Sequence, residues 1–249
     1  MAQHQNANEI KKKHVKPSKE TIQAYKQVQT AAKTVLRILP SQLNLHDTEA
    51  SIATKATRML VDLGYPDTWY YNCHAQVLLG SRSCLSISGK SYTAHDEVLG
   101  GTNLVSIDLS PMKDDIWGDY SRTFAFELGL WVEHPKTREY QNGFQFQNYI
   151  HQELVRWLKP HHTLHQLFAW ANVKIREKGF VNLDFRGNLG HSLAATREDR
   201  HFIQADDHTA LGDIQFFSFE PFVRVKGGHW GFKHEDIYFF DANDQLQVL

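Results

Sequence analysis

The chain repeats one order of hydrophobic patterns, in which two helical stretches are followed by short strand-like runs. Apolar residues recur at three- and four-residue steps from Ser18 until Pro40, which predicts the first helix. A second helix is expected to start after Asp47 as its N-cap and to end at Gly64 and Pro66. No linker rich in Pro, Gly or Ser divides the 249 residues, so they can bury a core as one large domain.

The rest of the chain continues the same alternation. Short apolar or alternating runs predict strands at residues 76–79, 84–87, 104–109 and 121–126. Two more helices are expected, at residues 142–158 and 164–178, and the second opens with the capping-box spacing of Thr163 and Gln166. Strands follow again at residues 214–219, 222–225 and 236–240. This order predicts an α+β fold and suggests two similar halves, although residue identities show no repeat.

Composition narrows the setting in which the protein works. Residues 1–17 are polar, carry three successive lysines and lack the apolar core of a signal peptide, so we expect a flexible N-terminal arm. No apolar run approaches the roughly 20 residues that span a bilayer. The net charge of -1 gives no bulk attraction to nucleic acid. We therefore predict a cytoplasmic protein without membrane or nucleic-acid partners, and its two cysteines, Cys73 and Cys84, are expected to be reduced.

Acidic residues interrupt several of the predicted strands. Asp108 lies on the strand face opposite Val105 and Ile107, and Asp119 follows it by eleven residues at the start of the next run. A hairpin of that length can place the two carboxylates side by side, where they repel each other unless a cation lies between them. The alternative is that Asp119 ends a turn and Asp108 faces water.

Further downstream, Glu220 stands inside the aromatic run FFSFEPFVRV, and Glu235 or Asp236 leads directly into an apolar strand. A buried carboxylate needs an arginine, a hydrogen-bond cluster or a metal ion as its partner. A salt bridge to Arg122 or Arg224 could explain one of these sites, but it is a weaker explanation for three sites at once.

His191, in the segment GNLGHSLA, completes the group of candidate ligands. The flanking glycines allow a sharp turn that brings the imidazole close to another group, although a lone histidine in a loop is usually structural. Carboxylates with one imidazole form a hard, oxygen-rich donor set suited to two ions of manganese, iron(II), cobalt or zinc. The lack of a Cys/His cluster argues against a structural zinc site.

The order of these residues resembles the methionine aminopeptidase and Xaa-Pro peptidase family, the pita-bread metallopeptidases. The five ligands stand in the segments VSIDLS, GDYSRTF, GHSLA, FSFEPFV and FKHEDIYFF, and the match runs from about residue 20 to the C-terminus. The resemblance implies two pseudo-symmetric halves around a curved antiparallel sheet, with residues 18–249 as one catalytic domain. It also implies a metallopeptidase that acts on a small peptide or a peptide N-terminus, with Mn²⁺ or Co²⁺ as the expected ions, and it is compatible with a homodimer.

Roles for single residues follow from the same resemblance. Asp108 would bind one metal ion, His191 and Glu220 the other, and Asp119 and Glu235 would bridge both. Glu220 would also be the general base. His95 and His201 would contact the substrate.

The chain departs from the family at several positions. Ala194 replaces the usual small glycine after GHSL, His201 is further from His191 than expected, and Lys233 stands where proline-specific members often carry arginine. These departures leave the substrate open between N-terminal methionine and Xaa-Pro bonds. Hydrolysis of another C–N bond in a modified amino acid, or a non-catalytic binding role, are the alternatives.

Overall fold

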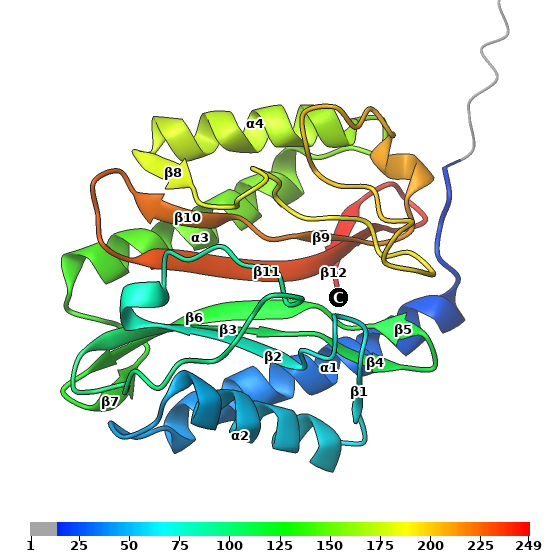
Figure 1. The fold of residues 1–249 in the computed structure, drawn as a ribbon. Helices are drawn as coiled ribbons and strands as arrows, with labels where there is room; N and C mark the ends of the chain where they lie inside the picture. The colour runs from blue at the N-terminus through cyan, green and yellow to red at the C-terminus, as the bar shows by residue number, and fades with distance from the viewer. Residues whose placement is uncertain (1–13) are drawn as a thin grey trace, which may run out of the picture.

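Two pairs of helices cover one curved antiparallel sheet in the computed structural model, which describes residues 14–249. The first pair, α1 (Lys19–Ile38) and α2 (Glu49–Asp62), lies against one half of the sheet. The second pair, α3 (Arg138–Trp157) and α4 (Leu164–Glu177), lies against the other half (Figure 1). The predicted α+β pita-bread fold with two similar halves is therefore confirmed.

Six strands form the main path of the sheet, in the order β2-β3-β6-β11-β10-β8. The first three are β2 (Ala75–Leu79), β3 (Asn103–Leu109) and β6 (Tyr120–Glu127), and the others are β11 (Gly231–Phe240), β10 (Phe222–Val225) and β8 (Phe180–Asn182). Three short strands extend this sheet: β7 (Leu130–Val132), β9 (Phe217–Phe219) and β12 (Leu246–Val248). A separate small sheet contains β1 (Asp67–Thr68), β4 (Pro111–Lys113) and β5 (Ile116–Trp117).

Each half has its own hydrophobic core, because each helix pair presents its apolar stripe to the strands beside it. Val35, Ile52 and Ile107 belong to the core under α1 and α2. Ile150 and Leu167 belong to the larger core under α3 and α4. The two halves meet where β6 pairs with β11, so residues of these two strands lie between both cores.

Side chains at the helix starts explain why the helices begin there. Ser18 caps α1, and the capping box predicted from Thr163 and Gln166 is present at α4. The N-cap of α2 is Thr48 and not the predicted Asp47. Asp47 instead accepts a hydrogen bond from the hydroxyl of Ser51, at 2.7 Å, and so supports the same helix start.

Three strand predictions differ from the structure. Residues 84–87 are not a strand, because the carbonyl of Ile87 accepts from the Gln76 side chain and makes no strand ladder. The strand expected at 214–219 is limited to 217–219. The last long strand starts at Gly231, five residues earlier than the predicted 236, since polar residues such as Lys233 and His234 hid its beginning.

Residues 1–13 of the predicted arm lie outside the described residues. The remaining part contacts the body: Lys16 and His14 pair with Asp244, and the amide of Val15 donates to the carbonyl of Gly212 at 2.7 Å. Within residues 14–249, no helix is long and apolar enough to cross a membrane. Both cysteines are free thiols, as predicted.

Candidate metal centre

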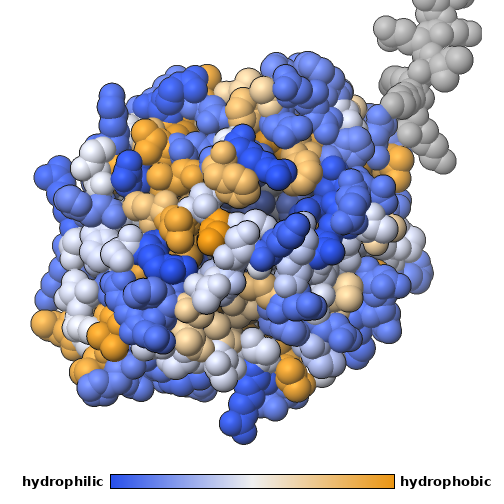
Figure 2. All heavy atoms as spheres, viewed as in Figure 1, coloured by the Kyte–Doolittle hydropathy of each residue, from blue (hydrophilic) through white to orange (hydrophobic). Residues whose placement is uncertain are grey.

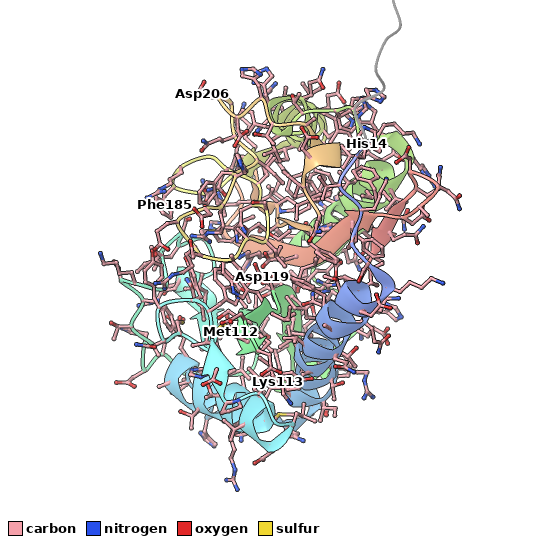
Figure 3. The ribbon with its side chains drawn as sticks, turned by 90° about the vertical axis from the view of Figure 1, so that its right-hand side faces the viewer. His14, Met112, Lys113, Asp119, Phe185 and Asp206 are labelled. Carbon is pink, nitrogen blue, oxygen red and sulfur yellow. The ribbon has the colours of Figure 1, made fainter. Side chains whose placement is uncertain are left out.

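The hairpin of β3 and β6 brings Asp108 and Asp119 to one side of the sheet. Asp108 is paired in register with Ser121, so Asp119 lies two residues before the position opposite it. Asp119 retains only 4% of its accessible surface. Figure 3 shows Asp119 in the interior between the two halves, whereas Phe185 lies on the outer side. The expected approach of these two strand segments is therefore present.

Glu235 and Asp236 are adjacent on strand β11 but have different partners. The guanidinium of Arg122 donates to both carboxylate oxygens of Asp236 at 2.9 Å, so this arginine explains one acidic residue and not the other. Glu235 lies opposite Ser121 across the strand pair and is 1% exposed. Among the described residues, neither of its carboxylate oxygens has a hydrogen-bond partner. A buried carboxylate in this state requires a cation or a proton.

His191 reaches the carboxylates from the loop before β9. Its backbone forms a β-bridge with Phe202, and the amide of Ser218 on β9 donates to the His191 carbonyl at 2.8 Å. The Nδ1 atom lies 3.0 Å from the carbonyl of Ser192 and can donate only as N–H, which leaves the lone pair on Nε2. Nε2 lies 3.4 Å from the Asp119 carboxylate. Burial first, and then the charge of Arg200, lower the pKa of His191 to about 3, so the ring is a neutral candidate ligand.

Glu220 lies between β9 and β10. The amide of Glu220 donates to the carbonyl of Leu189 at 2.9 Å, which ties its backbone to the loop that carries His191. Its side chain is 18% exposed, in contrast to the enclosed Glu235. Glu220 therefore lies at the boundary between the buried donors and the open space above them.

One cation of the chain lies among these acids. The ammonium of Lys233 is 2.6 Å from Asp108, 2.7 Å from Glu220 and 3.6 Å from Glu235. Lys233 precedes Glu235 by two residues on β11, so both side chains point to the same face of the strand. The structure thus places a lysine at the centre of the predicted ligand set.

Without a metal ion, burial and mutual repulsion favour the protonated forms of these acids. Burial raises the pKa of Asp108, and it raises the pKa values of Asp119 and Glu235 well above their usual range. Neighbouring carboxylates add to the shift: Asp108 acts on Asp119, and Asp119 acts on Glu235. In Lys233, burial opposes the charged form, but the negative charges of Asp108 and Glu220 raise its pKa well above the usual value. One ammonium therefore balances only part of the acidic charge.

The donor set fits divalent cations. Ligand oxygens of Asp108, Glu220 and Glu235 lie within 4.8 Å of one another, which is a spacing that one ion can bridge. Asp119 and the Nε2 atom of His191 stand beside them. Hard carboxylate oxygens and one imidazole suit manganese, cobalt, iron(II) or zinc. The observation in this structure that favours such an ion is that the buried Glu235 oxygens accept no hydrogen bond from the described residues.

A buried glutamine supports the site from behind and was not predicted. The side chain of Gln29 on α1 donates to the Asp119 carbonyl at 2.7 Å, and its oxygen accepts from the Asp119 amide at 3.0 Å. Gln29 is fully buried. Gln29 lies four residues after Tyr25, on the apolar face of the helix. A polar residue at this spacing is the sequence feature that could have indicated its buried role.

Four of the five candidate ligands line a cavity: Asp108, Asp119, His191 and Glu220. The fifth, Glu235, is not part of the lining. Aromatic and basic side chains form much of the wall: Trp69, Tyr70, Phe185, Arg186, Arg200 and Phe202. The guanidinium of Arg200 lies 5.3 Å from the Trp69 ring centre and 5.2 Å from that of Phe202. Figure 2 shows one face of the molecule, on which hydrophilic residues predominate and hydrophobic residues form separate patches. The cavity itself combines aromatic faces with positively charged groups beside the acids.

The two histidines expected to contact substrate do not line this cavity. His201 is exposed and its ring pairs with Asp207 at 3.0 Å. His95 is also exposed, and its Nδ1 accepts the Glu97 amide at 3.1 Å. Arg200, which precedes His201, faces the cavity instead because successive side chains of an extended segment point to opposite sides.

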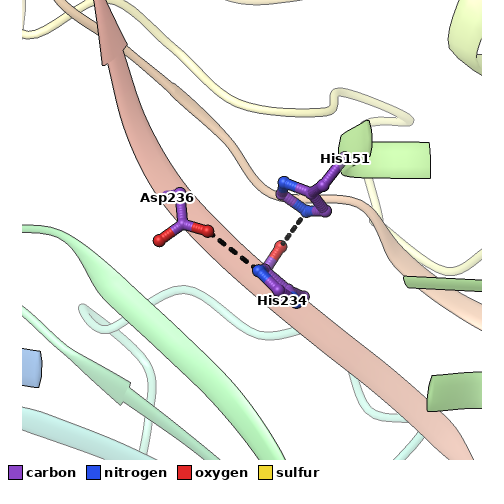
Figure 4. A group of neighbouring side chains, drawn as sticks. All are labelled: His151, His234 and Asp236. Carbon is purple, nitrogen blue, oxygen red and sulfur yellow. Dashed lines mark hydrogen bonds and ion pairs between the residues drawn. The ribbon is translucent and has the colours of Figure 1, made fainter. Parts of the chain in front are cut away.

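A second cluster, His151, His234 and Asp236, also has donor atoms close enough for a metal ion. Its atoms already have partners: His234 pairs with Asp236 at 2.8 Å, and the His151 ring pairs with the His234 carbonyl at 3.1 Å (Figure 4). The other ring nitrogen of His151 lies 2.8 Å from the Tyr238 hydroxyl, and Arg122 holds Asp236. This cluster is therefore a hydrogen-bonded connection between α3 and β11.

Comparisons with known proteins agree with this geometry. The sequence profile of metallopeptidase family M24 matches residues 23–242. No curated protein sequence matched the chain. Among solved structures, an X-Pro aminopeptidase from Thermotoga maritima is similar with a TM-score of 0.77 and 18% identity, covering 94% of this chain and 62% of that chain.

Two further solved structures show the range of similar proteins. A prolidase from Pyrococcus furiosus has a TM-score of 0.73 and 21% identity, covering 95% of this chain and 65% of that chain. A methionine aminopeptidase from Thermotoga maritima has a TM-score of 0.73 and 12% identity, covering 94% of this chain and 98% of that chain. At these identities the likeness shows the fold alone. The chain spans less than two thirds of the X-Pro aminopeptidase and prolidase chains.

Proposed function

The chain belongs to metallopeptidase family M24, and from this premise we propose that it is a metal-dependent peptidase for small peptides. The proposed ligands are Asp108, Asp119, His191, Glu220 and Glu235, which would hold two divalent ions, with Mn²⁺ or Co²⁺ as the first choice. The observation that carries the proposal is the buried carboxylate of Glu235, which has no hydrogen-bond partner among the described residues and lies beside a second enclosed acid, Asp119. Such a pair is costly in a folded protein unless a cation binds it.

Divalent ions bound by these ligands would supply Lewis acidity to a peptide carbonyl and acidify water. The protein's own part of the chemistry is proton transfer. Glu220 lies at the cavity with 18% of its side chain exposed, so it can take a proton from attacking water and deliver it to the leaving nitrogen. Neutral His191 cannot serve as the acid near neutral pH, because its pKa is about 3.

The cavity favours a small substrate. Its volume of about 180 Å³ is of the same order as the roughly 150 Å³ cavity that accepts benzene, so it admits one or two side-chain-sized groups. The wall offers aromatic faces from Trp69 and Phe202 together with the guanidinium of Arg200. A short peptide with an apolar ring or side chain beside the scissile bond fits these surfaces, and we propose Xaa-Pro bonds ahead of N-terminal methionine.

Hydrolysis of a peptide panel tests this function directly. Metal-stripped protein should gain activity when Mn²⁺ or Co²⁺ is added, with Xaa-Pro dipeptides cleaved faster than Met-Xaa and Pro-Xaa dipeptides. Product amines are measured by mass spectrometry, so that unexpected cleavage sites are also seen. No cleavage of any peptide, despite bound metal, would refute the peptidase proposal.

A matched variant shows whether the observed cleavage belongs to this site. Asp108→Asn should lower the metal content and the turnover together, because it removes a charged oxygen donor at nearly constant volume. Asp115→Asn, in the exposed turn between β4 and β5, removes the same charge elsewhere and should leave both unchanged. The cytoplasmic location and the homodimer stay predictions from the sequence.

A further inference from the structure

The ammonium of Lys233 occupies a position from which a cation would contact two proposed ligands. It lies 2.6 Å from the Oδ2 atom of Asp108 and 2.7 Å from the Oε2 atom of Glu220. Its side chain is 18% exposed, so it reaches this place from within the sheet and not from bulk solvent. These distances are those of charge-assisted hydrogen bonds.

The other three proposed ligands, Asp119, His191 and Glu235, receive no hydrogen bond from Lys233. Asp119 and His191 face each other at 3.4 Å, and no ammonium lies within 4.0 Å of Asp119 among the described residues. Glu235 is 3.6 Å from Lys233 and lacks a hydrogen bond to it. The lysine therefore divides the acids into two groups: Asp108 and Glu220, which its ammonium contacts at 2.6 and 2.7 Å, and Asp119 and Glu235, which receive no hydrogen bond from it.

We propose that Lys233 is a built-in counter-ion that makes the two metal positions unequal. The first divalent ion binds at Asp119, Glu235 and His191, to which the ammonium donates no hydrogen bond. The second must displace the ammonium from Asp108, because two positive groups cannot share the same oxygens at these distances. The inference rests on the proposed function, in that it requires the cluster to bind divalent ions.

The same ammonium should also affect the stability of the protein without metal. Four acidic side chains converge here, and Lys233 is the cation that contacts three of them. Removal of one partner from a buried ion pair leaves an uncompensated charge and is strongly destabilising. Lys233 should therefore keep the metal-stripped protein folded, and a chain without it should depend on metal for its stability.

Titration of metal-stripped protein with Mn²⁺, followed by calorimetry, tests the proposal. The wild-type protein should bind one ion per chain tightly and a second at least about tenfold more weakly. In Lys233→Met the second affinity should rise by about tenfold or more, while Lys233→Arg, which keeps the positive charge, should resemble the wild type. Lys226→Met, at an exposed position after β10, removes the same charge away from the cluster and should change neither affinity.

Thermal unfolding gives a readout that is independent of binding heats. Metal-stripped Lys233→Met should unfold at a lower temperature than the stripped wild type, and Mn²⁺ should raise its unfolding temperature by the larger amount. If this variant does not fold without metal, Lys233→Gln, which retains a hydrogen-bond donor, is titrated in its place.

The outcomes separate this inference from the proposed function. Two equal affinities in the wild type, or the same second affinity in Lys233→Met, would overturn the counter-ion proposal and leave the peptidase proposal standing. A failure of wild type and variant alike to bind any Mn²⁺ would overturn both.

Discussion

Glu220 and Glu235 carry the same chemical group but differ in what surrounds them. The Glu235 side chain is 1% exposed and faces other acids, whereas that of Glu220 is 18% exposed and lines the cavity. A general base must reach the proton that it abstracts from water beside the substrate. Of these two glutamates, only Glu220 combines a place in the proposed ligand cluster with access to the cavity, so the two carboxylates suit different roles.

Glu220→Gln should therefore abolish turnover while the protein stays folded. The amide has nearly the same volume but cannot accept a proton, and loss of a general base typically lowers the rate about 10²–10⁴-fold. The measurements are kcat on the best peptide and the circular dichroism spectrum. Glu133→Gln, at an exposed position after β7, is the matched control and should retain normal activity. Turnover near the wild-type rate in Glu220→Gln would remove this residue as the base.

Among the larger elements, the loop before β9 places His191 through a close approach of two backbones. Gly190 has φ of +134°, a conformation that side chains rarely adopt. A Cβ atom there would lie 2.2 Å from the carbonyl oxygen of Ser218. The glycine thus allows the loop to bridge with β9 closely enough to aim the imidazole at Asp119.

Gly190→Ala is expected to lower the free energy of unfolding by more than the roughly 1 kcal/mol cost of an unfavourable φ alone, because backbone must move as well. Urea unfolding measures the loss, and Mn²⁺ titration should show weaker binding as His191 shifts. Gly227→Ala is the control, since Gly227 also has a positive φ, of +76°, but has open space around it. Equal losses for the two variants would show that the contact with Ser218 is unimportant.

The elements show what the sequence could predict and where it could not. Helix positions followed from apolar periodicity and capping residues, and the clustered acids from carboxylates that interrupt apolar strands. The loop around His201 has no period, so no pattern indicates that Arg200 and not His201 faces the cavity. Lys233 was noted as a family departure, but its contacts with Asp108 and Glu220 depend on strand pairing distant in the chain.

At the scale of the whole molecule, the proposed metal centre lies on the seam between two halves that have separate cores. Asp108 and Asp119 come from the first half, and His191, Glu220 and Glu235 from the second. Cations bound there would connect the halves, because each half alone supplies an incomplete ligand set. Behind the seam, His151 on α3 joins β11 through the His234 carbonyl and the Tyr238 hydroxyl.

The buried ring of His151 predicts acid sensitivity in the neutral range. Burial, followed by the charge of His234, lowers the pKa of His151 well below its usual value, so the folded protein holds the ring neutral. The unfolded chain binds a proton below about pH 6.5, so protonation favours unfolding there. This residue should make the free energy of unfolding decrease as pH falls below about 6.5, with a slope of up to ~1.4 kcal/mol per pH unit.

His151→Gln should remove this contribution. The variant loses hydrogen bonds and should be less stable than the wild type at pH 7.5, but the difference should narrow as pH falls toward 5.5, because the wild type alone carries the cost of a buried histidine at this position. Urea unfolding of metal-stripped protein across that range measures the effect, and His46→Gln, at an exposed position, is the control. Parallel pH curves for wild type and His151→Gln would show that His151 does not set the acid sensitivity, and His191 and His234, whose pKa values burial also lowers, would then be the groups to test.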